Sequence, residues 1–239
     1  MEEIIKIEFN GEEIEVNKGA TLLSIAQERN VYIPTLCHND ALEPYGVCRM
    51  CLVEIEDRGR MRIVTSCNYQ AKEGLKVKTD TDKVVSTRNV VVELLLARAP
   101  ENKEIRELAE SFGIKGGRLE NVNDDCILCG MCVRTCNEVV GVHALGFAHR
   151  GIDRIPATPF VESSEICIGC GSCVYVCPTG YIKMIDKDGK RYIENWKVEL
   201  ELQQCENCGA DIAPKRQLDY IRNIADLPDD FYNLCWNCR

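Results

Sequence analysis

Hydrophobic and polar residues alternate near the start of the chain, which is the pattern of strands with one buried face. Asn10-Gly11 is a hairpin turn signal between the first two of these runs. Thr21 predicts the N-cap of a helix over residues 22–28. The predicted strands are residues 5–9, 13–16, 52–56, 62–64 and 75–77. Residues 1–80 therefore predict a β-grasp sheet curved over one helix.

After residue 80 the apolar residues follow a helical spacing instead. One helix is predicted from Thr81 to Arg98, where Pro100 ends it, and a second over residues 102–112. The expected buried face of the first helix is Val84, Val85, Val91, Leu94 and Leu95. Further strands are expected at residues 142–148, 181–185 and 190–193, and a helix at 214–224. The pattern predicts an α+β protein in which residues 81–118 form a helical linker.

Two cysteine runs in the second half of the chain share the spacing C-x2-C-x2-C-x3-C. Bacterial ferredoxins hold two [4Fe–4S] clusters with this run, and the fourth cysteine of each run binds the neighbouring cluster. One predicted ligand set is Cys126, Cys129, Cys132 and Cys177. The other is Cys167, Cys170, Cys173 and Cys136. Paired zinc knuckles are disfavoured, because zinc takes two pairs of ligands. Residues 119–192 are thus predicted to be a two-cluster, bacterial-ferredoxin-like domain.

Four more cysteines lie within the predicted β-grasp domain. Cys37, Cys48, Cys51 and Cys67 have the spacing C-x10-C-x2-C-x15-C. Four thiolates with one such loop suit a [2Fe–2S] cluster, with zinc as the alternative. Gly46 is expected to let the backbone approach the cluster, because it has no Cβ. His38 is expected either to donate a hydrogen bond that tunes the cluster or to be structural.

The last four cysteines form two knuckles around a long insert. Cys205, Cys208, Cys235 and Cys238 have the spacing C-x2-C-x26-C-x2-C, which is typical of a structural zinc site. A third [4Fe–4S] cluster is the alternative for these ligands. Residues 193–239 are therefore predicted to form a small four-cysteine knuckle domain.

Composition narrows the function. All 16 cysteines fall into metal-type spacings, which argues against a disulfide scaffold and for a reducing compartment. The net charge of −9 and the 6% of aromatic residues argue against nucleic-acid binding. No signal peptide is evident, and no apolar run approaches the roughly 20 residues of a membrane helix. We expect a cytoplasmic protein without direct membrane insertion.

The sequence shows no catalytic site of its own. It contains no nucleophile motif, no acid–base pair and no dinucleotide-binding G-x-G-x-x-G after a strand. The chemistry that remains is one-electron transfer through iron–sulfur centres. We therefore expect no catalytic residues in the chain and the role of an electron carrier.

Two sequence stretches around the first cysteines resemble a known family. Residues 33–38 (Ile-Pro-Thr-Leu-Cys-His) and 46–54 (Gly-Val-Cys-Arg-Met-Cys-Leu-Val-Glu) are similar to the start of the large iron–sulfur subunit of respiratory complex I. Over residues 1–190 the chain resembles the diaphorase-type iron–sulfur subunit of NAD-linked and electron-bifurcating hydrogenases. The resemblance implies a subunit that carries electrons between an FMN flavoprotein, which reacts with NAD(H), and a hydrogenase catalytic subunit. It also implies a small [2Fe–2S] subunit and soluble ferredoxin as partners.

The chain departs from that family in one respect and leaves alternatives open. The family carries a further cluster held by one His and three Cys, but no Cys lies between Cys67 and Cys126 here.

The same role in a formate or aldehyde dehydrogenase complex is one alternative, and a free-standing multi-cluster ferredoxin is another. The iron–sulfur subunit of succinate dehydrogenase is disfavoured by the long first gap, and a DNA-binding redox regulator is disfavoured by the acidic charge.

Overall fold

The computed structural model describes residues 3–116, 118–119, 122 and 124–239. The chain divides into two compact units, Met1–Cys129 and Gly130–Arg239. Both contain strands and helices, so the predicted α+β class is confirmed. None of the helices in the described ranges combines the length and hydrophobicity needed to span a bilayer.

The first unit is built on one mixed sheet. Its strands are β1 (Ile4–Phe9), β2 (Glu12–Asn17), β3 (Leu52–Asp57), β4 (Arg60–Thr65) and β5 (Lys76–Lys78). They are ordered β2-β1-β5-β3-β4, with β1 parallel to β5 and the other neighbours antiparallel. All five strands lie where the alternation of apolar and polar residues predicts them. The order, with a parallel pair at the centre and hairpins at both edges, is that expected of a β-grasp sheet.

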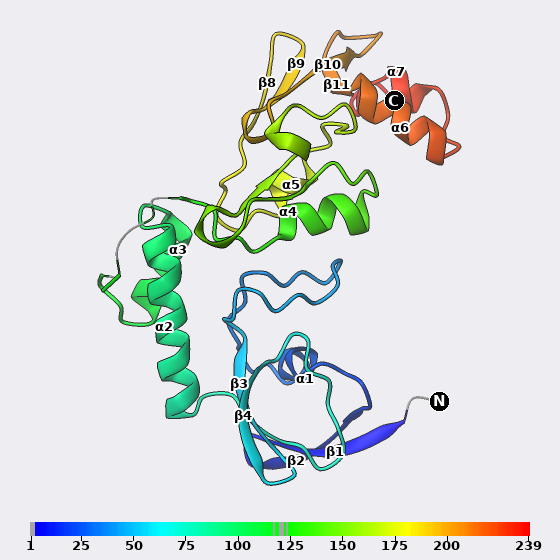
Figure 1. Cartoon of the computed structure of the whole chain (residues 1–239). Coiled ribbons are helices and arrows are strands. Elements are labelled where there is room, and N and C mark those ends of the chain that lie inside the picture. Colours follow the sequence, from blue (N-terminus) through cyan, green and yellow to red (C-terminus); the bar gives the residue numbers. More distant parts are fainter. Residues whose placement is uncertain (1–2, 117, 120–121, 123) are drawn as a thin grey trace. The chain divides into compact units, whose positions relative to one another are not determined.

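Helix α1 (Leu22–Glu28) packs against this sheet (Figure 1). The Thr21 side chain accepts a hydrogen bond from the Ser24 N–H, so the predicted N-cap is confirmed. Leu22, Leu23, Ile25 and Ala26 of the helix are buried. They share one core with strand residues and with Cys51 and Cys67. The cysteines are thereby anchored in the best-packed part of the unit.

Two helices follow the sheet, α2 (Asp82–Arg98) and α3 (Lys103–Ser111). Both are predicted by the sequence, but the predicted buried face of α2 is partly wrong. Val85 and Leu94 are 42% and 55% exposed, whereas Arg88 is only 7% exposed. The buried residues of α2 are Val84, Arg88, Val92, Leu95 and Ala97. Arg88 occupies this face because its guanidinium reaches the Leu52 carbonyl of β3, a polar partner that hydrophobic periodicity cannot reveal.

The second unit contains short helices and two sheets. Its helices are α4 (Met131–Arg134), α5 (Ser172–Tyr175), α6 (Lys215–Ile224) and α7 (Asp230–Asn233), with a π-helix at Thr135–Val139 and 3-10 turns at Gly151–Asp153, Pro159–Val161 and Glu194–Trp196. Its strands are β6 (Gly146–Ala148), β7 (Ile155–Ala157), β8 (Met184–Lys187), β9 (Lys190–Ile193), β10 (Val198–Gln204) and β11 (Asp211–Pro214). The strand expected at residues 142–148 is limited to β6, since His143 has a φ of +52°, which is incompatible with a strand.

The larger sheet of the second unit has the order β11-β10-β9-β8. In β10, Val198, Leu200 and Leu202 are buried and alternate with polar residues. The predicted domain limit at residue 192 falls between most of β9 and β10. These two strands nevertheless pair with each other, with Ile193 opposite Val198 and Lys190 opposite Glu201. The sheet therefore continues from the predicted two-cluster segment into the C-terminal segment.

Candidate metal centres

The first unit brings Cys37, Cys48, Cys51 and Cys67 together. Cys37 and Cys48 lie in the loop between α1 and β3, Cys51 immediately precedes β3, and Cys67 follows β4. All four are buried. The Ser66 N–H donates to the Cys51 carbonyl at 2.8 Å, which keeps the two ends of the β3–β4 hairpin together. The hairpin therefore fixes two of the thiols and the preceding loop supplies the other two.

The four thiols interact as two pairs. Hydrogen bonding with Cys37, together with burial, raises the pKa of Cys48. Hydrogen bonding with Cys51 and burial likewise raise the pKa of Cys67, while the same contact lowers the pKa of Cys51 to about 6. The structure thus places Cys37 beside Cys48 and Cys51 beside Cys67. A [2Fe–2S] cluster has two irons that share four thiolates, and two thiol pairs suit that arrangement.

Gly46 is constrained by neighbours from the Cys67 loop. Its φ is +69°, and a Cβ there would lie 2.9 Å from Asn68 Nδ2 and 3.2 Å from Thr65 Oγ1. From the sequence alone, this glycine is expected to allow close approach of the backbone to a cluster. The structure gives a second reason, which is that a side chain would press against the segment that precedes and follows Cys67.

Arg88 is a residue of this site that the sequence pattern does not reveal. Its Nη2 donates to the Leu52 carbonyl, and its buried Nε has no hydrogen-bond partner among the described residues. Burial lowers the pKa of Arg88, and the nearby Cys51 thiolate opposes that shift. A buried cation is costly unless negative charge lies close to it. The four-cysteine site with Arg88 at its side therefore fits a negatively charged group.

His38 follows Cys37 directly, and its largely buried imidazole contacts an exposed carboxylate. Its Nε2 lies 3.2 Å from Asp40 Oδ1, while its buried Nδ1 has no hydrogen-bond partner among the described residues. The choice between a tuning and a structural role for His38 stays open.

The second unit contains a cavity lined by four cysteines from both runs. Cys136 comes from the π-helix, Cys167 and Cys170 come from the loop before α5, and Cys173 lies in α5. The other walls of the cavity include Ile168, Ile193 and Trp196. The structure therefore places the last cysteine of the first run beside the first three of the second run. This is the grouping that the crossed-ligation hypothesis requires.

Burial dominates the protonation of these thiols. It raises the pKa of Cys173 to about 12, although the indole N–H of Trp196, 3.4 Å from the sulfur, acts in the opposite direction. Burial also raises the pKa values of Cys136 and Cys167. Isolated thiolates are therefore unfavourable here, and iron ions that neutralise them make the donor set favourable. An apolar pocket with four sulfurs and one N–H donor to sulfur fits an iron–sulfur cluster.

The remaining predicted cluster ligands are divided between the two units. Cys126 and Cys129 end the first unit, where the Arg98 Nε donates to the Cys126 carbonyl at 2.7 Å and the Asp124 carboxylate accepts from the Cys126 N–H at 3.1 Å. Cys132 and Cys177 belong to the second unit and pack in the same hydrophobic cluster as Cys173. The ligand set Cys126, Cys129, Cys132 and Cys177 stays a prediction.

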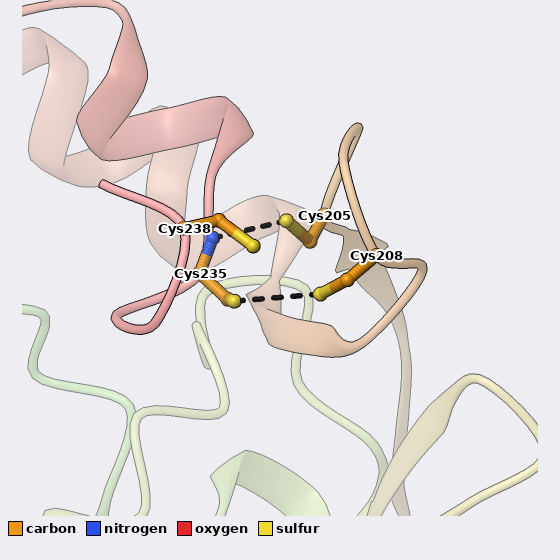
Figure 2. A group of neighbouring side chains, drawn as sticks. All are labelled: Cys205, Cys208, Cys235 and Cys238. Atoms are coloured by element: carbon orange, nitrogen blue, oxygen red, sulfur yellow. Dashed lines mark hydrogen bonds between the residues drawn. The ribbon is translucent and has the colours of Figure 1, made fainter.

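The C-terminal cysteines form the most compact group of sulfurs. Cys205 and Cys208 lie on the β10–β11 connection, and Cys235 and Cys238 follow α7 (Figure 2). All four Sγ atoms lie within 4.8 Å of one another, and Cys208 and Cys235 are 3.6 Å apart. One zinc ion with tetrahedral Zn–S bonds of about 2.3 Å requires sulfurs about 3.8 Å apart. The site therefore fits a single tetrahedral ion.

Backbone amides shape this site further. The Cys235 N–H donates to Cys205 Sγ at 3.3 Å, and this contact is the main reason that the pKa of Cys205 is lowered to about 6. The thiols of Cys208 and Cys235 raise the pKa of Cys238 to about 12. A cubane would place each thiolate on a different iron and hold the sulfurs farther apart. Within the described ranges no other cysteine group has its sulfurs this close together.

Comparison with protein families agrees with these sites. Residues 2–82 match the 2Fe-2S iron-sulfur cluster binding domain, which includes the first four cysteines. Residues 166–211 match the 4Fe-4S dicluster domain, which includes the second run and the first C-terminal pair. Iron–sulfur domains of both expected kinds are therefore present.

Related proteins are longer than this chain. It is 32% identical to a subunit of the NADH-quinone oxidoreductase of Rhizobium meliloti, over 86% of this chain and 27% of the relative. It is also 32% identical to the NADP-reducing hydrogenase subunit HndD of Solidesulfovibrio fructosivorans, over 74% of this chain and 35% of the relative. The NADPH-Fe(3+) oxidoreductase subunit alpha of Geobacter sulfurreducens is 30% identical over 99% of this chain and 31% of the relative. The chain thus spans about a third of these relatives.

A solved structure of similar fold comes from an NAD+-reducing [NiFe]-hydrogenase in its H2-reduced state. It has a TM-score of 0.57 and 25% identity, and the match covers 64% of this chain and 74% of that one. The resemblance predicted from the cysteine motifs is confirmed: the chain is homologous to subunits of NAD(P)-reducing hydrogenases and of NADH-quinone oxidoreductase, and it carries their iron–sulfur domains.

Proposed function

We propose that this chain is an electron-transfer subunit that links an FMN flavoprotein, reactive with NAD(H), to the catalytic subunit of a hydrogenase. The observation that carries the proposal is the cavity lined by Cys136, Cys167, Cys170 and Cys173, in which cysteines of two separate runs meet. Iron–sulfur clusters supply one-electron transfer when they are bound. The homology to NAD(P)-reducing hydrogenases supports the partner class.

The proposed cofactors are one [2Fe–2S] cluster and two [4Fe–4S] clusters. Cys37 and Cys48 would hold one iron of the [2Fe–2S] cluster, and Cys51 and Cys67 the other, because the thiols are paired in this way. The first [4Fe–4S] site is proposed to be Cys126, Cys129, Cys132 and Cys177. The second is proposed to be Cys136, Cys167, Cys170 and Cys173. The protein residues position the thiols, exclude water and supply hydrogen bonds to sulfur.

For the C-terminal site we propose one structural zinc ion held by Cys205, Cys208, Cys235 and Cys238. The distances between the sulfurs support a single ion over a third [4Fe–4S] cluster. All four ligands are thiolates, so the site leaves no open position for a substrate.

The proposed partners are a flavoprotein subunit, a small [2Fe–2S] subunit, hydrogenase catalytic subunits and soluble ferredoxin in the cytoplasm. The same role in a formate or aldehyde dehydrogenase complex is the alternative, since the chain itself contains nothing that selects the final substrate. Electron bifurcation within such a complex is compatible with this arrangement of centres.

The test is to purify the native complex anaerobically through a tag on this chain and to measure its metals and EPR spectra. We expect the complex to contain iron, zinc and FMN, together with the subunits of a nickel-containing or an iron-only hydrogenase. We also expect NADH to reduce the iron–sulfur clusters, as seen in their EPR signals. Molybdenum or tungsten instead would support the dehydrogenase alternative. A complex without iron–sulfur signals, or with signals that NADH and H2 both fail to reduce, would overturn the proposal.

A further inference from the structure

Helix α6, which lies between the two C-terminal knuckles, contacts both segments that supply the Cys136/Cys167/Cys170/Cys173 cavity. The Arg216 Nη1 donates to the Cys167 carbonyl at 3.1 Å and to the Ser164 carbonyl at 3.5 Å. The Tyr220 hydroxyl, one helical turn later, donates to the Val140 carbonyl at 2.8 Å. One short helix thus holds the start of the Cys167 loop and the end of the π-helix.

The second of these contacts bears on Cys136 directly. The Val140 N–H donates to the Thr135 carbonyl at 3.0 Å, which closes the π-helix that carries Cys136. Tyr220 therefore fixes the residue that caps the element that brings Cys136 to the cavity. Gly141 follows, and a Cβ there would lie 3.4 Å from the Tyr220 hydroxyl, so the chain passes close to α6.

The strands next to α6 support the same loop. A Cβ on Gly169 would lie 2.6 Å from Leu200 Cδ1 of β10 and 3.2 Å from Pro214 Cγ of β11. The Arg191 Nη1 donates to the Gly169 carbonyl at 2.9 Å, while Asp186 holds its other nitrogens at 2.7 Å. The Cys167–Cys170 loop is thus packed against the C-terminal part of the sheet.

Helix α6 is in turn tied to the metal knuckles. The Arg222 guanidinium lies 4.3 Å from the centre of the Tyr232 ring, and the Tyr232 hydroxyl donates to the Ala225 carbonyl at 3.3 Å. Tyr232 belongs to α7, which leads directly into Cys235. The Glu206 N–H donates to the Asn233 carbonyl at 3.0 Å and joins the two knuckles. The position of α6 therefore depends on the contacts that hold the two cysteine knuckles together.

We propose that the C-terminal four-cysteine module positions the ligands of the neighbouring [4Fe–4S] cluster, with Arg216 and Tyr220 as the positioning residues. This inference rests on the proposed function, because it presupposes a cluster at Cys136, Cys167, Cys170 and Cys173. Metal at the knuckles fixes α6, and α6 holds the two ligand segments in register. The guanidinium of Arg216 also lies beside the cluster loop, where positive charge favours the reduced and more negative form.

The experiment compares six variants of the tagged complex by EPR-monitored redox titration and metal analysis. Arg216→Gln and Tyr220→Phe each remove one contact, and Cys208→Ser weakens metal binding at the knuckles. Lys215→Gln is the matched control, because Lys215 precedes Arg216 on α6 but pairs with Glu201 at 2.8 Å on the surface. We expect Arg216→Gln to shift the potential of one [4Fe–4S] signal to more negative values and to reduce its intensity. Arg216→Lys keeps the positive charge, so the reduction potential in this variant should lie closer to that of the wild type than in Arg216→Gln.

The affected signal identifies the cluster. The proposal requires that Arg216→Gln, Tyr220→Phe and Cys208→Ser all change the same [4Fe–4S] signal, that Cys136→Ser abolishes this signal, and that Lys215→Gln leaves it at the wild-type potential. Equal effects of Arg216→Gln and Lys215→Gln, or wild-type potentials in all variants, would overturn it. If the wild-type complex itself lacked [4Fe–4S] signals, the proposed function would fail instead, so the two failures are distinguishable.

Discussion

At the scale of single residues, the least expected feature is the buried guanidinium of Arg88 beside the first cysteine site. Its Nη2 bonds the Leu52 carbonyl, its Nε has no partner among the described residues, and only 7% of the residue is exposed. Such a group is stable only if the site that it borders carries negative charge. Arg88 therefore connects helix α2 to the electrostatics of the first cysteine site.

We predict that Arg88→Leu lowers the reduction potential of the [2Fe–2S] cluster, because loss of a nearby cation disfavours the more negative reduced form. Loss of the hydrogen bond to the carbonyl should also cost about 1.5–3 kcal/mol of unfolding free energy. Redox titration and thermal unfolding measure the two effects. Lys83→Gln is the control, since Lys83 lies on the same helix but is exposed, with its Nζ 3.6 Å from Glu54. Equal potentials in both variants would contradict the prediction.

A second residue-scale prediction compares two glycines with positive φ. Gly46→Ala should destabilise the protein by about 1–3 kcal/mol through backbone strain, with an added cost from the contact with Asn68. Gly59→Ala has a similar φ of +74° but no atom within 4 Å, so it isolates the strain alone. Denaturant unfolding should show a larger loss for Gly46→Ala, together with poorer retention of the [2Fe–2S] cluster. If both variants lost the same unfolding free energy, the side chains of Asn68 and Thr65 would have moved away to make room for the added Cβ at Gly46.

The sequence indicates which cysteines belong together, because the spacing of thiolates reflects the geometry of the group that they bind. The grouping of Cys136 with the second run follows from the same spacing, and the structure places it there. Arg88, Trp196, Arg191 and Arg216 could not be found in this way. Each contacts a carbonyl or a sulfur that lies far away in the sequence, and no local pattern encodes such a contact.

At the scale of elements, the last cysteine of the first run lies beside the first three cysteines of the second run. Cys136 comes from a π-helix, and the other three cysteines of its cavity come from α5 and the loop before it. We predict that Cys136→Ser weakens the cluster of the second run, whereas Cys177→Ser weakens the cluster of the first run. EPR of each variant should lose a different [4Fe–4S] signal. Loss of the Cys126 cluster signal in Cys136→Ser would contradict the crossed assignment.

We predict that metal binding at the C-terminal four-cysteine site depends on pH. The raised pKa of Cys238, about 12, means that this thiol is protonated in the metal-free site at neutral pH and must release its proton when metal binds. The lowered pKa of Cys205, about 6, means that this sulfur is already a thiolate at neutral pH and gains a proton only when the pH falls through that value. Zinc affinity should therefore fall with falling pH, and more steeply below about pH 6.

Chelator competition across this range measures the effect, with zinc content determined in parallel. The [2Fe–2S] signal of the same samples is the internal control for unfolding. An affinity that does not change with pH would indicate that the four thiols do not bind the metal, or that they are already thiolates before it binds.

The pattern of apolar and polar residues predicts the helices and strands less well where a polar contact or a short strand determines the local structure. The alternation in β1 to β5 predicts that sheet, since one face is buried and the other is solvated. The predicted face of α2 is partly wrong because an arginine occupies a core position. Strand β10 shows clear alternation as well, yet only knuckles were expected there, because the cysteines dominate the pattern of that segment.

At the scale of the whole molecule, the chain contains four groups of four cysteines, and all sixteen are described by the structure without a disulfide bond. The predicted domain limits near residues 80, 118 and 192 stay predictions. The compact units divide between Cys129 and Gly130, inside the first cysteine run. Sequence patterns locate cysteine groups and strands, but a boundary depends on how segments pack, which the spacing of residues does not specify.

The pairing of β9 with β10 has a consequence for how the protein is made. Until β10 leaves the ribosome, β9 is an open sheet edge that can associate with other chains. Trp196, which lies between these strands and forms part of the cavity wall, is also absent from a shorter nascent chain. The cavity lined by Cys136, Cys167, Cys170 and Cys173 is thus complete only after Trp196 and strand β10 have been synthesised. A cluster is therefore expected to assemble in this cavity only after β10 has left the ribosome, and a ribosome-stalled chain ending before Trp196 should aggregate rather than accept a cluster there.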